Sequence, residues 1–296
     1  MPFLSALVST ATQTERALAE FGVGFLFGAA DFLGKLEISS EKVNVLADIP
    51  YGPDPAHRLD VLMPVGPTKG IAIHVHGGGF RLLSKDSHRH IAREIAARGY
   101  VTLNVNYRLA PEHKYPSALQ DIASALEWAA ANRELLGVEG PEVVLVGESA
   151  GAYLVMMTAL AMSGEVDEVW ARRIERLGFR PTLTVPISGL MDMKRNVRCD
   201  SKMAESEVER ARLAFAGSAE VPDPIDLLTS GARVRGLVKV VRATQDPLRV
   251  HSDALFTVLS SSGSKVEMQS FDGPHSFHAF TWTDAARDAW DWILPR

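Results

Sequence analysis

The segment Gly147-Glu-Ser-Ala-Gly151 follows one apolar run, Glu142 to Val146, and its last two residues open a longer one, Ala150 to Met162. The first run has the length and β-branched composition of a buried strand, and the second has the length of a helix. A strand, a tight turn with a serine at its tip and a helix make up a nucleophile elbow, in which glycine on each side of the serine leaves room for the turn. The segment therefore predicts an α/β fold with an exposed, reactive hydroxyl on Ser149.

Short strand-like runs alternate with longer helical patterns along the rest of the chain. We expect six strands, at Ile71 to Val75, Val101 to Asn106, Glu142 to Val146, Leu183 to Ile187, Leu237 to Ala243 and Val266 to Phe271. We expect helices at Ser87 to Arg98, Ser117 to Asn132, Ala150 to Met162 and Leu248 to Ser261. This alternation predicts a mostly parallel central sheet with helices on both faces. Two further runs, Val43 to Ile49 and His57 to Met63, flank a turn sequence and predict an antiparallel edge hairpin.

Two regions do not fit the alternation: the first forty residues, and the stretch from Leu190 to Ser230. The second region is too long for a plain connection between strands, and it contains a charged helical pattern from Ala204 to Phe215. We therefore expect residues 41–296 to form one catalytic domain with a cap inserted at about 190–230.

The bulk composition excludes several classes of partner. The chain has 296 residues with 31 basic and 36 acidic side chains, and no block of like charge that would attract nucleic acid. The single cysteine, Cys199, excludes an internal disulfide and a cysteine-rich metal site, which fits a reducing compartment. The N-terminus lacks the basic start of a secretory signal, and the apolar segment Ala17 to Ala30 is too short to span a bilayer. We expect a cytoplasmic protein without membrane contact.

A second glycine-rich motif, His76-Gly-Gly-Gly-Phe80, directly follows the strand expected at Ile71 to Val75. Without Cβ atoms, backbone N–H groups can approach the oxyanion of a tetrahedral intermediate. The N–H of Ala150, next to the nucleophile, would complete such a site. A flexible glycine turn is the alternative interpretation, but the elbow at Ser149 favours an oxyanion hole.

A serine hydroxyl is a weak nucleophile, so the chain must supply a histidine as base and a carboxylate that orients it. Asp246 lies in a loop after the strand expected at Leu237 to Ala243, and His275 lies in the loop after the last strand. The order serine, aspartate, histidine is the order of α/β-hydrolases. Both loops follow the carboxyl ends of strands, where open α/β sheets build their sites.

Each of these two assignments has a rival. His278 is three residues beyond His275, but His275 is closer to the strand end and follows Gly273-Pro274, where the chain turns. Asp192 also follows a strand, but Asp246 lies on the strand nearer in sequence to the histidine.

The other histidines do not form a pattern of metal ligands. His74 lies inside an expected strand and is interpreted as a packed core residue. His88 and His90 are two positions apart and point to different sides of a helix. We expect neither a metal nor a cofactor.

Five motifs together resemble the hormone-sensitive-lipase-like (family IV) bacterial esterases of the α/β-hydrolase superfamily: His76-Gly-Gly-Gly-Phe80, Tyr107-Arg-Leu-Ala-Pro-Glu112, Gly147-Glu-Ser-Ala-Gly151, Asp246-Pro-Leu248 and His275-Ser-Phe277. The match runs from about residue 60 to 281. The resemblance implies a catalytic triad of Ser149, Asp246 and His275, and an oxyanion hole made by Gly78, Gly79 and Ala150. It also implies a helical cap built from residues 1–40 and the insertion at about 190–230, and esters of short- to medium-chain acids as substrates.

The sequence departs from that family at two positions, with Glu148 where aspartate is common and Ser276 where glycine is usual. Neither change removes a catalytic group, and we expect Glu148 to make a buried polar contact below the elbow. The Tyr107 to Glu112 stretch is interpreted as a loop that supports the oxyanion strand.

These observations predict a carboxylesterase that forms an acyl-Ser149 intermediate and acts on a small-molecule ester, with a homodimer as one alternative to a monomer. The same machinery would cleave amides, and a lipase would need an exposed apolar lid. A binding protein that keeps the fold without turnover is a further alternative, as in the plant gibberellin receptors, which resemble this family but lack the catalytic histidine.

Overall fold

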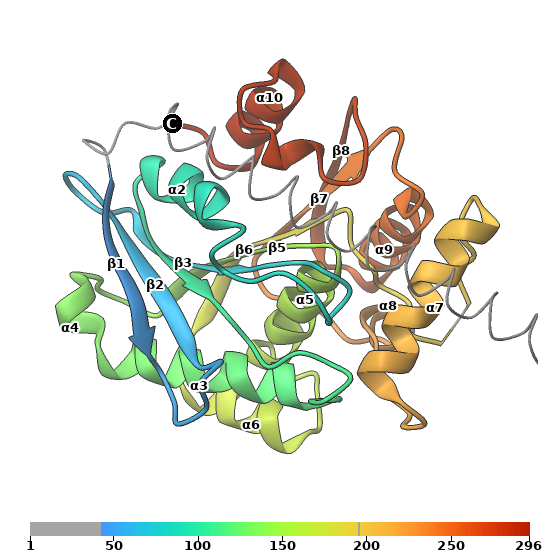
Figure 1. Ribbon diagram of the computed structural model, residues 1–296, viewed down its shortest axis with the longest axis horizontal. Coiled ribbons are helices and arrows are strands. Elements are labelled where there is room, and N and C mark those ends of the chain that lie inside the picture. Colours follow the sequence, from blue (N-terminus) through green and yellow to red (C-terminus); the bar gives the residue numbers. More distant parts are fainter. Residues whose placement is uncertain (1–42, 195) are drawn as a thin grey trace, which may run out of the picture.

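The computed structural model describes residues 43–194 and 196–296 (Figure 1). The cap helices expected at residues 1–40, and with them the apolar segment at 17–30, lie outside the described residues. No helix in the described part of the chain is long and apolar enough to cross a lipid bilayer.

A single eight-stranded sheet forms the centre of the molecule, with the strand order β1-β2-β4-β3-β5-β6-β7-β8. Its strands are β1 (Val43–Pro50), β2 (Arg58–Pro64), β3 (Gly70–Val75), β4 (Tyr100–Val105), β5 (Glu142–Glu148), β6 (Arg180–Ile187), β7 (Leu237–Ala243) and β8 (Lys265–Phe271). Strand β2 pairs antiparallel with β1 and with β4, and all other neighbours are parallel. The six expected strands and the antiparallel edge hairpin are confirmed.

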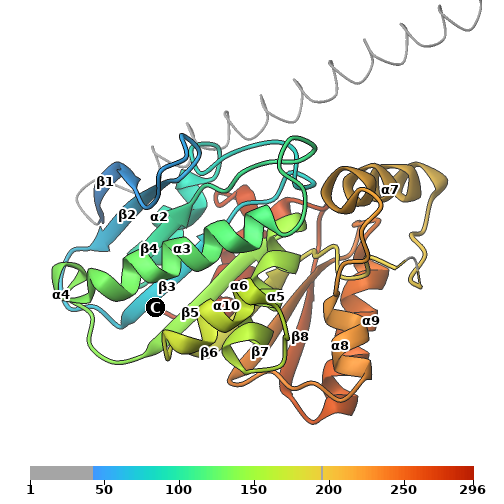
Figure 2. The same ribbon diagram turned by 90° about the horizontal axis from the view of Figure 1, so that it is seen from below.

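Helices cover both faces of the sheet, as the alternating pattern predicts (Figures 1 and 2). One face is covered by α2 (Arg89–Ala97) and α10 (Asp284–Ile293), and the other by α3 (Ser117–Ala131), α5 (Ala150–Met162), α6 (Val169–Arg176), α8 (Pro224–Thr229) and α9 (Arg249–Ser262). A short helix, α4 (Arg133–Leu136), follows α3. The sequence predicted α2, α3, α5 and α9 but missed α4, α6, α8 and α10, which are only four to ten residues long.

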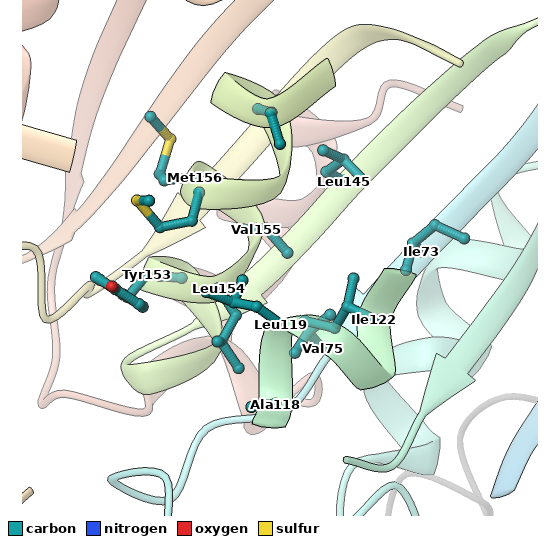
Figure 3. Close-up of a cluster of buried hydrophobic side chains, with 14 of the residues drawn as sticks. Ile73, Val75, Ala118, Leu119, Ile122, Leu145, Tyr153, Leu154, Val155 and Met156 are labelled. Atoms are coloured by element: carbon teal, nitrogen blue, oxygen red, sulfur yellow. The ribbon is translucent and has the colours of Figure 1, made fainter. Parts of the chain in front are cut away.

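Helix α5, which begins directly after Ser149, lies in the middle of the core, and all of its residues are buried. It has no polar stripe because it packs on all sides. Figure 3 shows Leu154 and Val155 of α5 among side chains of β3, β5 and α3, including Val75, Leu145 and Leu119. A helix buried in this way gives the turn at Ser149 a rigid support.

The stretch from Leu190 to Ser230 contains α7 (Lys202–Ala216) and α8, so the helical pattern predicted at Ala204 to Phe215 falls within α7. Helix α7 begins at Ser201, whose side chain accepts a hydrogen bond from the backbone of Ala204, as a helix N-cap does. Figures 1 and 2 place α7 beside α8 and α9 at one end of the sheet.

Candidate active site

Ser149 occupies the turn between β5 and α5 with φ of 52° and ψ of −115°. A positive φ is strained for a residue with a side chain, and such strain is typical of a nucleophile elbow. The turn leaves no space around it: a Cβ on Gly147 would lie 2.4 Å from the Gly151 carbonyl oxygen, and one on Gly151 would lie 2.2 Å from that of Val75. Glycine at both flanking positions is therefore a steric requirement.

The backbone of Ser149 is tied to the next strand, β6, and to the loop that follows it. Its N–H donates to the Ile187 carbonyl at 2.9 Å, and its own carbonyl accepts from the N–H of Leu190 at 3.2 Å. These bonds fix the strained turn from outside its own segment.

The structure brings the predicted acid and base together, from the loops after β7 and β8. Nδ1 of His275 donates to Oδ1 of Asp246 at 2.9 Å, and the same oxygen accepts from the N–H of Leu248 at 2.8 Å. Asp246 is buried, whereas the side chain of His275 is 33% exposed. A proton held on Nδ1 leaves Nε2 of His275 as the basic nitrogen, which is the tautomer a general base requires.

Each member of this pair shifts the pKa of the other. Burial alone would raise the pKa of Asp246, but the hydrogen bond and charge of His275 and the hydrogen bond from the N–H of Leu248 act against burial, and the pKa lies below its usual value. Burial would lower the pKa of His275, but the hydrogen bond and the charge of Asp246 raise it above its usual value. A stronger base results, and its imidazolium form is stabilised.

The two rival residues are engaged elsewhere. His278 is buried, with Nε2 2.5 Å from Oε2 of Glu148. Asp192 accepts from the N–H of Lys194 at 2.8 Å and lies beside Arg212, which also donates to its carbonyl. Among the described residues, the contact with Asp246 is therefore made by His275 and not by His278.

The loop after β3 has the backbone conformation that its glycines predict. Gly78 and Gly79 have φ of 104° and 59°, and a Cβ on Gly78 would lie 2.1 Å from the Leu82 carbonyl oxygen. Ala150 begins α5, so its N–H belongs to the first turn of a helix, where the partial positive charge favours an anion. These are the three residues expected to form the oxyanion hole.

Tyr107 supports this loop from the segment that follows the neighbouring strand β4, as the sequence predicted for the stretch that begins at Tyr107. Its hydroxyl donates to the carbonyl of His76 at 3.0 Å, and the two rings stack with centroids 4.4 Å apart. The adjacent residue, Arg108, is held by Asp121 of α3 through its backbone N–H at 2.7 Å and through its guanidinium.

His74 lies in β3, is buried and contacts Asn104 through Nδ1 at 2.9 Å, so its interpretation as a core histidine is confirmed. One acidic cluster in the described part of the chain has the spacing of metal ligands, formed by the carboxylates of Asp48, Asp60 and Asp86. Nζ of Lys85 already lies 2.7 to 2.9 Å from all three, so an ammonium group occupies the position that a cation would take.

Sequence comparison identifies the family. A family described as alpha/beta hydrolase fold matches residues 72–281, which is most of the chain. The chain belongs to this family. The match includes both glycine-rich motifs and the loops of Asp246 and His275.

Similar α/β-hydrolases include the carboxylesterase NlhH of Mycobacterium tuberculosis, 29% identical over 209 residues, which covers 68% of this chain and 63% of NlhH. The esterase LipU of the same organism is 27% identical over 201 residues, covering 68% of this chain and 60% of LipU. The chain therefore spans less than two thirds of the length of these relatives. Mouse hormone-sensitive lipase is 34% identical over 94 residues, 31% of this chain and 12% of the lipase, and the predicted resemblance is confirmed.

Two solved α/β-hydrolase structures have the same fold. An esterase from Pyrobaculum calidifontis superposes with a TM-score of 0.70 at 23% identity, covering 93% of this chain and 92% of that one. Esterase B of Lactobacillus rhamnosis superposes with a TM-score of 0.76 at 18% identity, covering 99% and 95%.

Proposed function

We propose that the protein hydrolyses carboxylic esters through an acyl-enzyme intermediate on Ser149. The observation that supports this most directly is the Asp246–His275 hydrogen bond of 2.9 Å, from loops at the same edge of the sheet as the strained turn of Ser149. The family, and the relatives named carboxylesterase and esterase, favour an ester over other acyl compounds.

In the proposed reaction, Oγ of Ser149 attacks the ester carbonyl carbon while Nε2 of His275 takes the hydroxyl proton. Asp246 stabilises the imidazolium that forms. Three backbone N–H groups would stabilise the oxyanion, those of Gly78, Gly79 and Ala150. The intermediate collapses, the C–O bond to the alcohol breaks, and the leaving oxygen receives the proton from His275. Water then attacks the acyl group, with its proton taken by His275, and the released Oγ of Ser149 regains that proton.

We propose acyl groups of short to medium length, and a cap formed in part by α7. Two contacts support this role of α7: a Cβ on Gly79 would lie 3.6 Å from that of Ala211, and the ring of Phe215 stacks on Phe80 at 4.1 Å. Tyr153 packs edge-on against both rings, and all three aromatic side chains are buried. Large rings packed against the oxyanion loop would limit the space for an acyl chain.

The test is hydrolysis of a p-nitrophenyl ester series from acetyl to palmitoyl by the wild type and by Ser149→Ala. We expect activity that peaks at short chains, and a loss of several orders of magnitude in the variant, because removing a triad nucleophile costs about 10⁶-fold in kcat. Unchanged circular dichroism would show that Ser149→Ala is folded. Full activity of Ser149→Ala would refute the mechanism, and a wild type inactive on every ester would favour an amidase or a binding protein.

A further inference from the structure

Glu148, the residue before the nucleophile, is 4% exposed at the end of β5, and its carboxylate contacts two imidazole rings from distant parts of the chain. Oε1 accepts a short hydrogen bond from Nε2 of His88, which precedes α2. Oε2 lies 2.5 Å from Nε2 of His278, which belongs to a short 3₁₀ helix, η2 (Phe277–Ala279). The two oxygens of one carboxylate therefore connect two segments that flank the candidate site.

Both segments belong to loops that carry predicted catalytic groups. His278 is three residues beyond His275, so its contact with Glu148 fixes the loop of the base. Nδ1 of His88 contacts the Ser87 hydroxyl at 2.9 Å, and Oγ of Ser87 also accepts from the N–H of Ser84, which follows the oxyanion loop.

The oxyanion loop also packs directly on Glu148. A Cβ on Gly77 would lie 3.0 Å from Oε1 of Glu148 and 3.1 Å from its carbonyl oxygen, so position 77 has no room for a side chain. The elbow, the oxyanion loop and the loop of His275 therefore meet at one carboxylate.

The carboxylate is charged. Burial would raise the pKa of Glu148, but the rings of His88 and His278 outweigh burial and hold its pKa well below the usual value. An ionised carboxylate can only accept, so Nε2 of His88 must carry the proton of its hydrogen bond to Oε1. Nε2 of His278 lies within ion-pair distance of Oε2. A charge buried this deeply requires such partners, and the loss of either would leave it poorly compensated.

Other titratable groups face Glu148 from each element around it: His74 of β3, His76 after β3, His90 of α2, Tyr107 after β4, and His275 after β8. Burial lowers the pKa of His74 to about 4 and the pKa values of His76 and His90 to about 3, so these rings are neutral at pH values above about 5. Burial raises the pKa of Tyr107, which also stays neutral. The negative charge of Glu148 contributes to the raised pKa of His275.

We propose that Glu148 is a positioning residue of the hydrolytic site, which holds the oxyanion loop, the elbow and the loop of His275 in register through its contacts with His88 and His278. This inference rests on the proposed function. It assigns no contact between Glu148 and the substrate, because the carboxylate is buried beneath the elbow.

The experiment compares Glu148→Gln, Glu148→Asp and His278→Ala on p-nitrophenyl acetate from pH 5 to 9. We expect kcat of Glu148→Gln to fall about 10- to 100-fold with KM changed less than about 2-fold, because a displacement near 1 Å costs about that much in rate. The acidic limb of its pH profile should move to lower pH, because the charge that raises the pKa of His275 is gone. Glu148→Asp keeps the negative charge, so the acidic limb of its pH profile should lie where it does in the wild type. His278→Ala should lower kcat without moving the acidic limb.

The matched control is Glu94→Gln. Glu94 is a second buried glutamate, 6% exposed, whose carboxylate pairs with Arg98 in α2 and which lies outside the proposed site. This control should lower the melting temperature and leave kcat and the acidic limb unchanged. The proposal would be overturned if Glu148→Gln kept the wild-type kcat and an unmoved acidic limb. It would also be overturned if Glu94→Gln lost as much kcat as Glu148→Gln.

Should Glu148→Gln fail to fold, Glu148→Asp and His278→Ala carry the same test, and wild-type kcat in both would overturn the proposal. The rate at which an organophosphate labels Ser149 provides a second readout that needs no turnover. Activity that persists in Ser149→Ala would instead refute the proposed function. Activity that is lost in Ser149→Ala but unchanged by substitutions of Glu148 would refute only this inference.

Discussion

At the scale of single residues, the site depends on hydrogen bonds that decide where protons lie. The Asp246 carboxylate fixes the proton of His275 on Nδ1, and the Glu148 carboxylate does the same for Nε2 of His88. Since a carboxylate only accepts, each contact selects one imidazole tautomer. Of His88, His275 and His278, the one with a partly exposed side chain is His275.

Asp246→Asn tests this coupling. We expect kcat to fall by about four orders of magnitude, because an amide favours the wrong tautomer of the base. The acidic limb of the remaining activity should move to lower pH, because the hydrogen bond and charge of Asp246 raise the pKa of His275 against the effect of burial. Asp192→Asn is the matched comparison, and a larger loss in that variant would show that Asp192 is the functional acid.

At the scale of elements, α5 supports the turn at Ser149, and α7 packs against the loop of Gly78 and Gly79. Helix α5 is buried on all sides, so it has little freedom to move. Helix α7 meets the loop after β3 through Phe215 and Ala211, and its residue Leu213 is 54% exposed. The acyl preference should therefore respond to changes in α7.

Phe215→Ala should admit longer acyl chains, because it removes a ring stacked on Phe80 and leaves a cavity beside the oxyanion loop. We expect the ratio of kcat/KM for p-nitrophenyl octanoate to that for the acetate to rise about 10-fold or more, since each buried methylene contributes about 0.8 kcal/mol. Phe179→Ala, just before β6, also removes a buried ring and should leave the ratio unchanged. An unchanged ratio in Phe215→Ala would show that α7 does not line the acyl site.

At the scale of the whole molecule, the antiparallel edge is joined to the rest by an ionic cluster around two buried side chains, Lys85 and Asp60. Lys85, 1% exposed, contacts Asp60 of β2 at 2.9 Å and Asp48 of β1 at 2.7 Å. Arg89 of α2 also donates to Asp60 at 2.8 Å. Burial would raise the pKa of Asp60, but the hydrogen bonds from Arg89 and Lys85 outweigh it, so the pKa lies below its usual value.

A carboxyl group whose pKa falls on folding stabilises the protein above its unfolded pKa, about 3.9, and this contribution is lost as the pH falls through the folded pKa. Asp60→Asn should therefore reduce the free energy of unfolding at pH 7 by about 3 kcal/mol, as breaking a buried ion pair does. The difference from the wild type should begin to shrink as the pH falls below the unfolded pKa of about 3.9. Urea denaturation at pH 7 and pH 3 measures the free energy of unfolding of the wild type and of Asp60→Asn. An equal difference between the two proteins at both pH values would contradict a stabilising role of the ionised Asp60.

The succession of strands and helices along the chain can be predicted locally from the sequence, because short apolar runs and glycine turns need no distant partner to be recognised. The order of the strands within the sheet is not local, since β4 lies between β2 and β3. The elbow at Ser149 and the loop at Gly78 and Gly79 were predictable for the same reason. The short helices α6 and α8 were not, since eight and six residues carry little periodicity and their stability comes from packing on α5 and α9.

Sequence alone therefore determined the family, the order of the elements and the loops in which an acid and a base must lie. Tertiary structure decided which side chains meet. His275 pairs with Asp246 from 29 positions away and Glu148 meets His88 across 60, and both contacts require strands or loops that only the assembled sheet brings together. A local motif is fixed by neighbours along the chain, whereas a hydrogen bond between loops depends on the packing of every element between them.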